Sequence, residues 1–204
     1  MSRTPKGKQK VGMMYPVFAP ITGYTEGSMP TYGTGKVIME ARTATVTFEY
    51  GNNPDYGDDR IVAEDNGPTG MTMQFESTGI SNADRIIMLA EEARSSGGGQ
   101  WISDQPTPYG GFGYIDKMLD EDAEHYDYEA WITLKIHFRE ESRTSQTREG
   151  TTAWGHPVFQ GRAIPLDIDN SGKLRFQLHE TFETIAAAKA FINGILNVPS
   201  ATST

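Results

Sequence analysis

Apolar and polar residues alternate with a period of two in four segments of the chain, a pattern typical of β-strands that bury one face. The segments are residues 43–50 (TATVTFEY), 70–78 (GMTMQFEST), 128–138 (YEAWITLKIHF) and 173–179 (KLRFQLH). Because antiparallel sheets commonly bury one face and leave the other polar, the pattern predicts an antiparallel β-sandwich or a barrel-like fold.

The alternation assigns each of these strands a polar and an apolar face. In the first two strands the predicted polar face is made by Thr45, Thr47, Glu49, Thr72, Gln74 and Glu76. In the third strand, the predicted apolar face consists of Ala130, Ile132, Leu134, Ile136 and Phe138. The fourth would turn Leu174, Phe176 and Leu178 inward.

Two segments show the 3.6-residue period of an amphipathic helix. Residues 83–96 (ADRIIMLAEEARSS) follow the candidate caps Ser81 and Asn82, and residues 181–197 (TFETIAAAKAFINGILN) begin at the candidate cap Thr181. Both are predicted to pack on the sheet, so the fold class is mainly β, or α+β.

Three stretches lack periodicity and are predicted to be long loops: residues 51–70, 95–109 and 140–156. Such loops tend to carry function or to be disordered. We expect a single domain over residues 11–198, with a flexible basic arm at residues 1–10 and a flexible tail at residues 199–204.

The charge of the chain indicates which classes of partner it is expected to bind. The 204 residues carry a net charge of -9, and four of the 18 basic residues lie in the first ten positions. The rest holds 14 basic against 27 acidic residues, which argues against gripping nucleic acid because phosphate binding depends on Lys and Arg. No apolar run approaches the length of a membrane helix, so we expect a soluble protein.

The most acidic stretch is residues 55–66 (DYGDDRIVAEDN), where five carboxylates surround one arginine: Asp55, Asp58, Asp59, Arg60, Glu64 and Asp65. A metal site or a catalytic pair would need burial or converging ligands, and the surrounding Gly and Asn residues favour a hydrated loop. The same holds for residues 120–129 (DEDAEHYDYE).

Other motifs do not complete a known chemistry. Residues 33–36 (GTGK) lack the remaining P-loop residues and are expected to turn a hairpin. Residues 167–172 (DIDNSG) open like a calcium loop, but Leu178 stands where the bidentate Glu is needed, so a turn is favoured. The histidines are scattered and cysteine is absent. We therefore predict neither a cofactor nor a metal, and no enzymatic activity.

The order of five segments resembles the major tail proteins, or tail tube proteins, of long non-contractile-tailed bacteriophages. The segments are residues 56–67 (YGDDRIVAEDNG), 70–81 (GMTMQFESTGIS), 128–138 (YEAWITLKIHF), 155–167 (GHPVFQGRAIPLD) and 179–197 (HETFETIAAAKAFINGILN). The resemblance spans about residues 11–198.

This resemblance implies a β-sandwich subunit flanked by helices, which forms hexameric rings that stack into the tail tube of the virion and conduct DNA during ejection. The subunit would be made in the cytoplasm of the bacterial host, and its partners would be other copies of itself, with tape-measure and tail terminator proteins as further candidates. The acidic stretch would reach a neighbouring subunit or ring. The polar strand face would line the lumen, where an acidic wall would repel phosphate.

Two other classes fit the same sequence. A carbohydrate-binding β-sandwich could use Trp101, Tyr109, Trp131 or Trp154 as a stacking platform. A calcium-dependent hydrolase could use the acidic loops.

Arg60→Glu is expected to impair the stacking of rings more than the folding of the subunit, since it removes the one cation among five acids. Electron microscopy of tube length checks this, and tubes of normal length would refute the assignment of residues 55–66 to an assembly loop.

Overall fold

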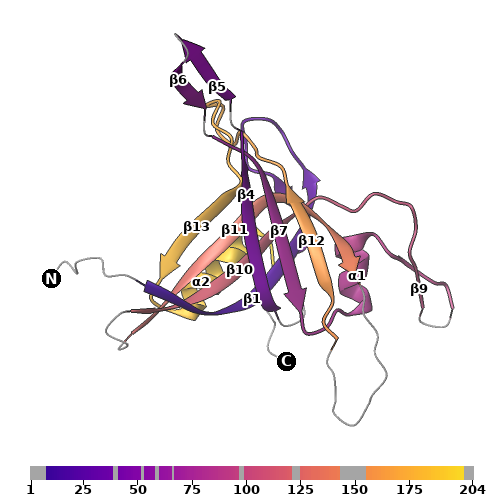
Figure 1. Ribbon diagram of the computed structural model, residues 1–204. Coiled ribbons are helices and arrows are strands. Elements are labelled where there is room, and N and C mark those ends of the chain that lie inside the picture. Colours follow the sequence, from indigo (N-terminus) through magenta and orange to yellow (C-terminus); the bar gives the residue numbers. More distant parts are fainter. Residues whose placement is uncertain are drawn as a thin grey trace.

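The computed structural model (Figure 1) describes residues 8–38, 41–51, 53–57, 60–65, 67–96, 99–120, 125–142 and 155–199. The chain is mainly β, with 54% strand and 12% helix, as the alternating pattern predicted. No helix in these ranges is long and apolar enough to cross a membrane.

Most strands belong to one antiparallel sheet. Its strands follow the order β2-β1-β10-β11-β12-β7-β4, with β13 also paired to β11 and β3 to β1. The bounds are β1 Lys8–Gly23, β2 Thr31–Tyr32, β3 Lys36–Val37, β4 Ala41–Tyr50, β7 Pro68–Ser77, β10 Gly110–Asp120, β11 Tyr126–Ser142, β12 Val158–Ala163 and β13 Gln177–Phe182. Two hairpins stand apart, β5 (Asn53–Gly57) with β6 (Arg60–Asp65) and β8 (Glu92–Ala93) with β9 (Gln100–Trp101).

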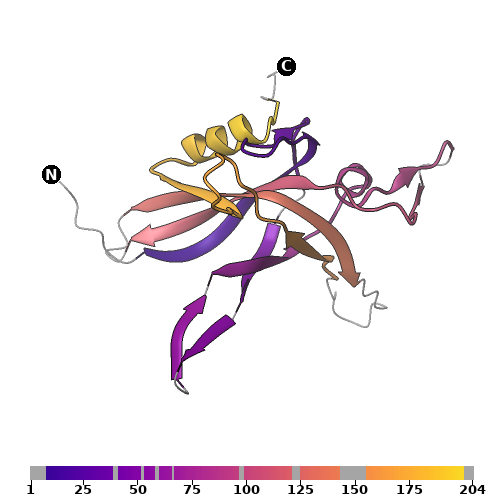
Figure 2. The ribbon, with the colours of Figure 1, turned by 90° about the horizontal axis from the view of Figure 1, so that it is seen from above.

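Buried apolar side chains form two clusters, one on each face of β10. The larger cluster lies between β1, β10 and α1 (Asn82–Leu89) on one side and β7 and β12 on the other, and includes Phe18, Phe75 and Phe112. The smaller cluster packs α2 (Ile185–Ile195) onto the opposite face of β1, β10 and β11. Figure 2 shows α2 on one side of these strands and β4 and β7 on the other.

A β-bulge in β11 moves this strand from one side of the larger cluster to the other. In the pairing of β10 with β11, Phe112 faces Thr133 but Gly110 faces Ile136, so the bulge lies at Leu134 and Lys135. An extra residue reverses which side chains face inward. Before the bulge, Trp131 packs on the larger cluster and Ile132 lies under α2; after it, Ile136 belongs to the larger cluster.

The predicted apolar face of β11 is therefore only partly right. Its five residues are all buried, as the pattern required. However, Ala130 and Ile132 face α2, whereas Ile136 and Phe138 face the larger cluster. The alternating pattern did not reveal that the inward side changes, because side chains on both faces of the first half of β11 pack against other parts of the protein.

Backbone groups at the bulge form hydrogen bonds with residues outside the pairing of β10 with β11. The N–H of Leu134 donates to the carbonyl of Phe176 at 3.0 Å, and the N–H of Ile164 donates to the carbonyl of Lys135 at 2.9 Å. The Tyr32 hydroxyl donates to the carbonyl of Leu134 at 2.7 Å, and burial raises the pKa of Tyr32. The bulge is thus held by segments distant in sequence, and buried polar groups without such partners would destabilise the fold.

The helices begin and end at different residues from those predicted. Ser81 caps α1, and its side chain and that of Asp84 form a capping box. The helix ends at Leu89 because Ala90 adopts a left-handed conformation, with φ 56°, so the predicted extension to residue 96 is wrong. Thr184, and not Thr181, caps α2 by accepting the N–H of Ala187.

Several predicted loops and turns are also corrected. Strand β1 begins at Lys8, so the basic arm predicted over residues 1–10 overlaps a strand, and Lys10 lies 2.5 Å from the carboxylate of Asp116. Residues 33–36 do not turn a hairpin, because β2 and β3 each pair with β1. In residues 173–179, Phe176 is buried but Leu174 is 64% exposed, and strand β13 begins only at Gln177.

Phe75→Ala should destabilise the subunit by about 3–5 kcal/mol, because it leaves a cavity in the larger cluster. The Phe75 side chain is fully buried, with ring centroids 5.2 Å from Phe112 and 6.2 Å from Phe159. Urea unfolding at low protein concentration measures the change. Tyr50→Ala is the control, since Tyr50 is 65% exposed and its loss should cost less than about 0.5 kcal/mol. Equal effects of the two substitutions would contradict this packing.

Candidate functional site

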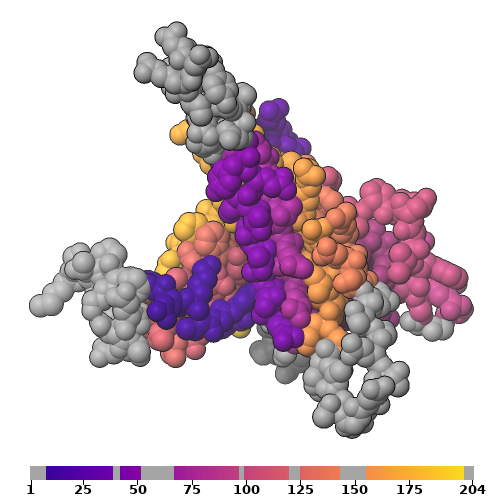
Figure 3. Space-filling view, in the orientation of Figure 1, coloured from indigo at the N-terminus to yellow at the C-terminus, as the bar shows by residue number. Residues whose placement is uncertain are grey.

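The face of β4, β7, β12 and the end of β11 that points away from the larger cluster is polar. Two rows of paired residues cross all four strands. One row is Thr45, Gln74, Gln160 and Arg139; the other is Thr47, Thr72, Arg162 and His137. Figure 3 shows this face, with β4 in purple beside β7 and β12.

The six residues of the predicted polar strand face are exposed or partly exposed. Thr45, Thr47, Glu49 and Gln74 are exposed and Thr72 and Glu76 are partly exposed, while Met71, Met73 and Phe75 on the other face of β7 are buried. Glu76 pairs with Arg42, with 3.2 Å between the charged atoms. Whether this face lines a lumen remains a prediction.

Four cationic or titratable side chains gather on the β11 and β12 part of this face. We call Lys135, His137, Arg139 and Arg162 the basic row. With Thr72 and Gln160, His137 and the two arginines line a hollow of about 350 Å³. Arg139 donates from its Nε to the Gln160 side-chain oxygen at 3.2 Å, and that partner is neutral.

His137 lies between these cations and two loop residues. Its Nδ1 is 3.3 Å from the Thr107 hydroxyl, and the ring of Tyr109 packs edge-on at 5.1 Å between centroids. Burial lowers the pKa of His137 below its ordinary value of 6.5, and the positive charges of Arg139 and Arg162 lower it further. The neutral imidazole is therefore favoured at pH 7.

The same part of the sheet has two edges without a strand partner in the described ranges. Strand β4 pairs with β7 on one side, and no described strand pairs with its other side. The pairing of β10 with β11 stops at Ile136, so residues 137–142 of β11 pair only with β12 among the described strands. A hollow of about 500 Å³, lined by Ile102, Thr107 and Glu140 among others, lies along this second edge.

Part of the acidic stretch forms strands and not the loop that was predicted. Asp55 lies on β5, and Arg60, Glu64 and Asp65 lie on β6; Asp55 pairs with Ala63 in the antiparallel register. Asp58 and Asp59 lie outside the described residues. Figure 1 shows this hairpin projecting beyond the end of β4 and β7. Its predicted contact with another subunit remains a prediction.

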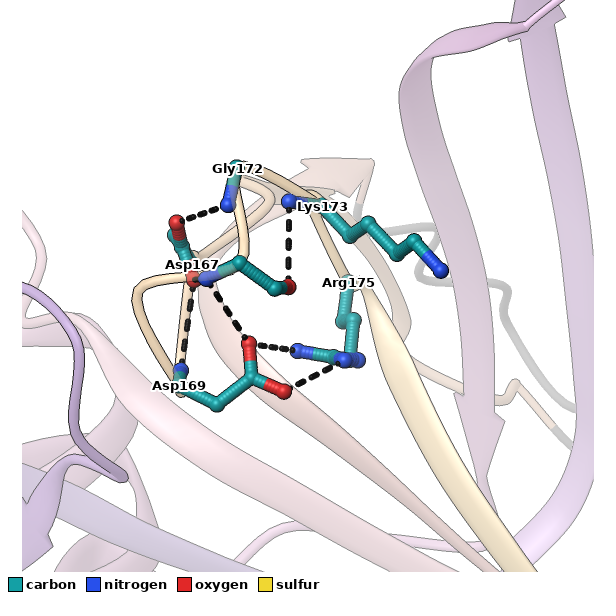
Figure 4. Close-up of polar contacts among 6 residues, drawn as sticks. Asp167, Asp169, Gly172, Lys173 and Arg175 are labelled. Atoms are coloured by element: carbon teal, nitrogen blue, oxygen red, sulfur yellow. Dashed lines mark hydrogen bonds and ion pairs between the residues drawn. The ribbon is translucent and has the colours of Figure 1, made fainter.

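Residues 167–174 form a turn, as predicted, between the bridged residues Leu166 and Arg175. The Asp167 carboxylate accepts backbone N–H groups of Asp169 and Gly172, and Arg175 forms a bidentate pair with Asp169 at 2.8 Å (Figure 4). Arg175 lowers the pKa of Asp169. These carboxylates already have donors and a cation, so the turn offers no ready calcium cage.

The remaining candidate residues do not converge. Among the described residues, no group of three or more His, Cys, Asp or Glu side chains could hold a metal ion. In residues 120–129, Asp127 pairs with Lys8 of β1. Trp131 stacks on His179 at 4.3 Å between centroids, and the Lys10 ammonium lies 5.2 Å from the same ring. Trp154 lies outside the described residues, and Trp101 is 59% exposed under the Arg94 guanidinium.

Sequence reasoning did not single out Arg139 and Arg162. They lie on neighbouring strands because β11 pairs with β12, which places Arg139 opposite Gln160 and Arg162 opposite His137. The alternation of polar and buried residues in 158–163 (VFQGRA) was the available signal for Arg162, since Phe159 and Ala163 are buried on the opposite face.

Comparison with known proteins adds no relative: no model of a known family matches the chain, and no similar curated protein is found.

His137→Gln should reduce the loss of stability on acidification. Because the folded-state pKa of His137 lies below 6.5, the unfolded chain binds the proton first, so stability is full above pH 6.5 and falls as the pH drops. Urea unfolding of both proteins between about pH 7.5 and about pH 5 measures the slope. The variant should show the shallower decline, and identical slopes would contradict the environment described for His137.

Proposed function

We propose that the protein is a tail tube subunit of a long non-contractile bacteriophage tail, which assembles through heterologous contacts into a ring. One observation carries the proposal. A polar-faced, four-stranded part of the sheet has an unpaired edge at each end, β4 at one and residues 137–142 of β11 at the other, within the described chain.

These two edges are suited to pair with each other in successive copies. Unpaired strand edges expose N–H and C=O groups that favour addition of another strand. The central part of β4, from Thr43 to Glu49, pairs with β7 without a bulge, and its length is close to that of residues 137–142. It contains no proline or lysine, which often protect edges from pairing.

The directions of the strands permit the contact. Strand β11 is antiparallel to β12, β12 to β7, and β7 to β4, so β11 and β4 run in opposite directions. Rotation about an axis roughly along the strands preserves direction, so β4 of one copy would meet β11 of the next as an antiparallel pair. A head-to-tail contact repeated by rotation closes into a ring.

The polar face would then become one wall of a large barrel. Large barrels place polar residues toward a water-filled lumen, and Thr45, Thr72 and Gln74 are neutral hydrogen-bonding groups. On this proposal the subunit is a β-sandwich, with β1 and β10 behind the larger cluster. Rings would stack into the tube of the virion, and tape-measure and tail terminator proteins would be its further partners.

The two rival classes have less support. A sugar-stacking platform needs an open aromatic face, and Trp131 has His179 on its ring, with Lys10 also close to it. A calcium-dependent hydrolase needs a cage of free oxygens, and the carboxylates of Asp167 and Asp169 already accept hydrogen bonds.

The proposal is tested by proline at two adjacent positions of β4, Ala44→Pro and Thr45→Pro. Consecutive N–H groups of a strand point to opposite sides, so one substitution removes a donor to β7 and the other removes a donor to the free edge. We expect one variant to be destabilised in urea unfolding. The other should retain a folded subunit and fail to form rings in electron microscopy.

Both readouts are needed to interpret the pair. A variant that keeps wild-type stability and still forms rings at wild-type concentration would contradict pairing through β4. The proposal predicts that the variant with wild-type stability forms no rings.

A further inference from the structure

We infer that the basic row is a receptor for the acidic β5–β6 hairpin of the adjacent copy in the ring. This inference rests on the proposed ring and adds to it a second, electrostatic contact. The receptor is formed by Lys135, His137, Arg139 and Arg162, and its occupant is a second copy of this chain.

Arg139 and Arg162 have no carboxylate partner among the described residues. Arg94, whose guanidinium lies over Trp101, also has none there, whereas three other arginines form ion pairs. Arg42 pairs with Glu76 and Arg175 with Asp169. Arg85 bonds Glu91 and Glu140. By contrast, Arg139 bonds only the neutral Gln160, and Arg162 makes no ion pair or hydrogen bond within the described ranges, although both side chains are exposed.

The cationic side chains of Lys135, Arg139 and Arg162 also lie on neighbouring positions of β11 and β12. His137 and Arg162 are direct Cα partners, as are Arg139 and Gln160. Lys135 lies two residues before His137 on the same strand, where its ammonium is 4.9 Å from the centre of the Tyr109 ring that also packs on His137. Like charges held this close repel one another, so an anion placed between them is favoured.

Strand direction brings the acidic hairpin to this place. If β4 of the next copy pairs antiparallel with residues 137–142, its last residue, Tyr50, lies near the His137 end of that edge. The hairpin leaves β4 at Tyr50 and projects beyond it (Figure 1). Its strands carry Asp55, Glu64 and Asp65 against the single cation Arg60.

Nucleic acid is the alternative anion for the basic row. The net charge of -9 disfavours it, because phosphate binding depends on excess cations. Covering the arginines with a protein carboxylate would also leave the polar face without an exposed basic patch that could hold passing DNA. The second copy is therefore the favoured occupant.

Charge reversal on each side of the contact tests the inference. One variant carries Arg139→Glu and Arg162→Glu, a second carries Asp55→Lys and Glu64→Lys, and a third combines all four. The control carries Lys117→Glu and Lys189→Glu, two lysines that pack on Tyr126 and Tyr15, away from the basic row. A further variant, Arg139→Gln with Arg162→Gln, removes both positive charges without adding negative ones and so is less prone to misfold. Urea unfolding measures the stability of every variant.

Sedimentation velocity gives the protein concentration at which half of the subunits are in rings. We expect each charge-reversed pair to raise this concentration roughly tenfold or more. The combined variant should return the concentration close to the wild-type value, and the control should leave it unchanged. Added NaCl screens charges, so it should also raise the protein concentration at which half of the wild-type subunits are in rings.

The outcomes separate this inference from the ring itself. If the wild type forms rings and both reversed pairs form them equally well, the hairpin contact is wrong and the ring stands. If the wild type forms no rings, both proposals fail. If Arg139→Gln with Arg162→Gln leaves rings intact but abolishes binding of a labelled DNA duplex, the basic row is a nucleic-acid site and the hairpin contact is overturned.

Discussion

The bulge at Leu134 and Lys135 of β11 is the constraint on which the arrangement of the subunit depends. It changes which alternate residues of β11 point inward, so that Trp131 before the bulge and Ile136 after it both contact the larger cluster. The reversal requires unpaired backbone groups at the bulge, and the carbonyl of Phe176 and the hydroxyl of Tyr32 satisfy them. Without the bulge, His137 and Arg139 would point into the larger cluster and Ile136 and Phe138 would point away from it. Polar and charged side chains would then be buried and apolar ones exposed.

The surface chemistry follows from the same bulge. Beyond Ile136 the strand leaves β10, and this separation opens the edge that the proposed ring uses. The reversal also turns His137 and Arg139 outward, beside Arg162 of β12. The acidic net charge of the chain is therefore not spread evenly, since the arginines of the basic row lie beside neutral Thr and Gln side chains, whereas Glu49 and Glu76 of the same face lie on β4 and β7. Pairing of these arginines with the hairpin of another copy would reconcile that surface with a conduit for DNA.

The sequence pattern was sufficient where one face of a strand is buried and the other is wet. Strand β7 meets this condition. In β4 the predicted polar residues are exposed, but the opposite face is only half-buried at Ala44 and Val46, and Phe48 is exposed. Strand β10 was missed because Gly111 and Gly113 stand where apolar side chains would signal burial; a Cβ at Gly113 would lie 3.0 Å from Ile192 of α2. Strand β1 was missed because its pairing with β10 shifts between Met14 and Val17, near Tyr15 with φ 57°, which breaks the period.

The basic row could not be predicted for a different reason. Its members come together through long-range register between β11 and β12, and local periodicity carries no information about which strands pair. The acidic hairpin was visible as a charge cluster, but Gly and Asn residues suggested a loop where β5 and β6 pair. Hydrogen bonding between two short strands outweighed their weak local propensity.

In the proposed assembly, subunits join edge to edge into a closed ring. Electron microscopy of the purified protein over a concentration series, with the particle mass measured in solution, tests it most directly. Edge-to-edge pairing predicts rings of about six subunits around a central channel, whose wall is a continuous sheet formed from successive copies. Particles that remain monomeric at every concentration, or rings whose channel is not lined by β4 and β7, would contradict it.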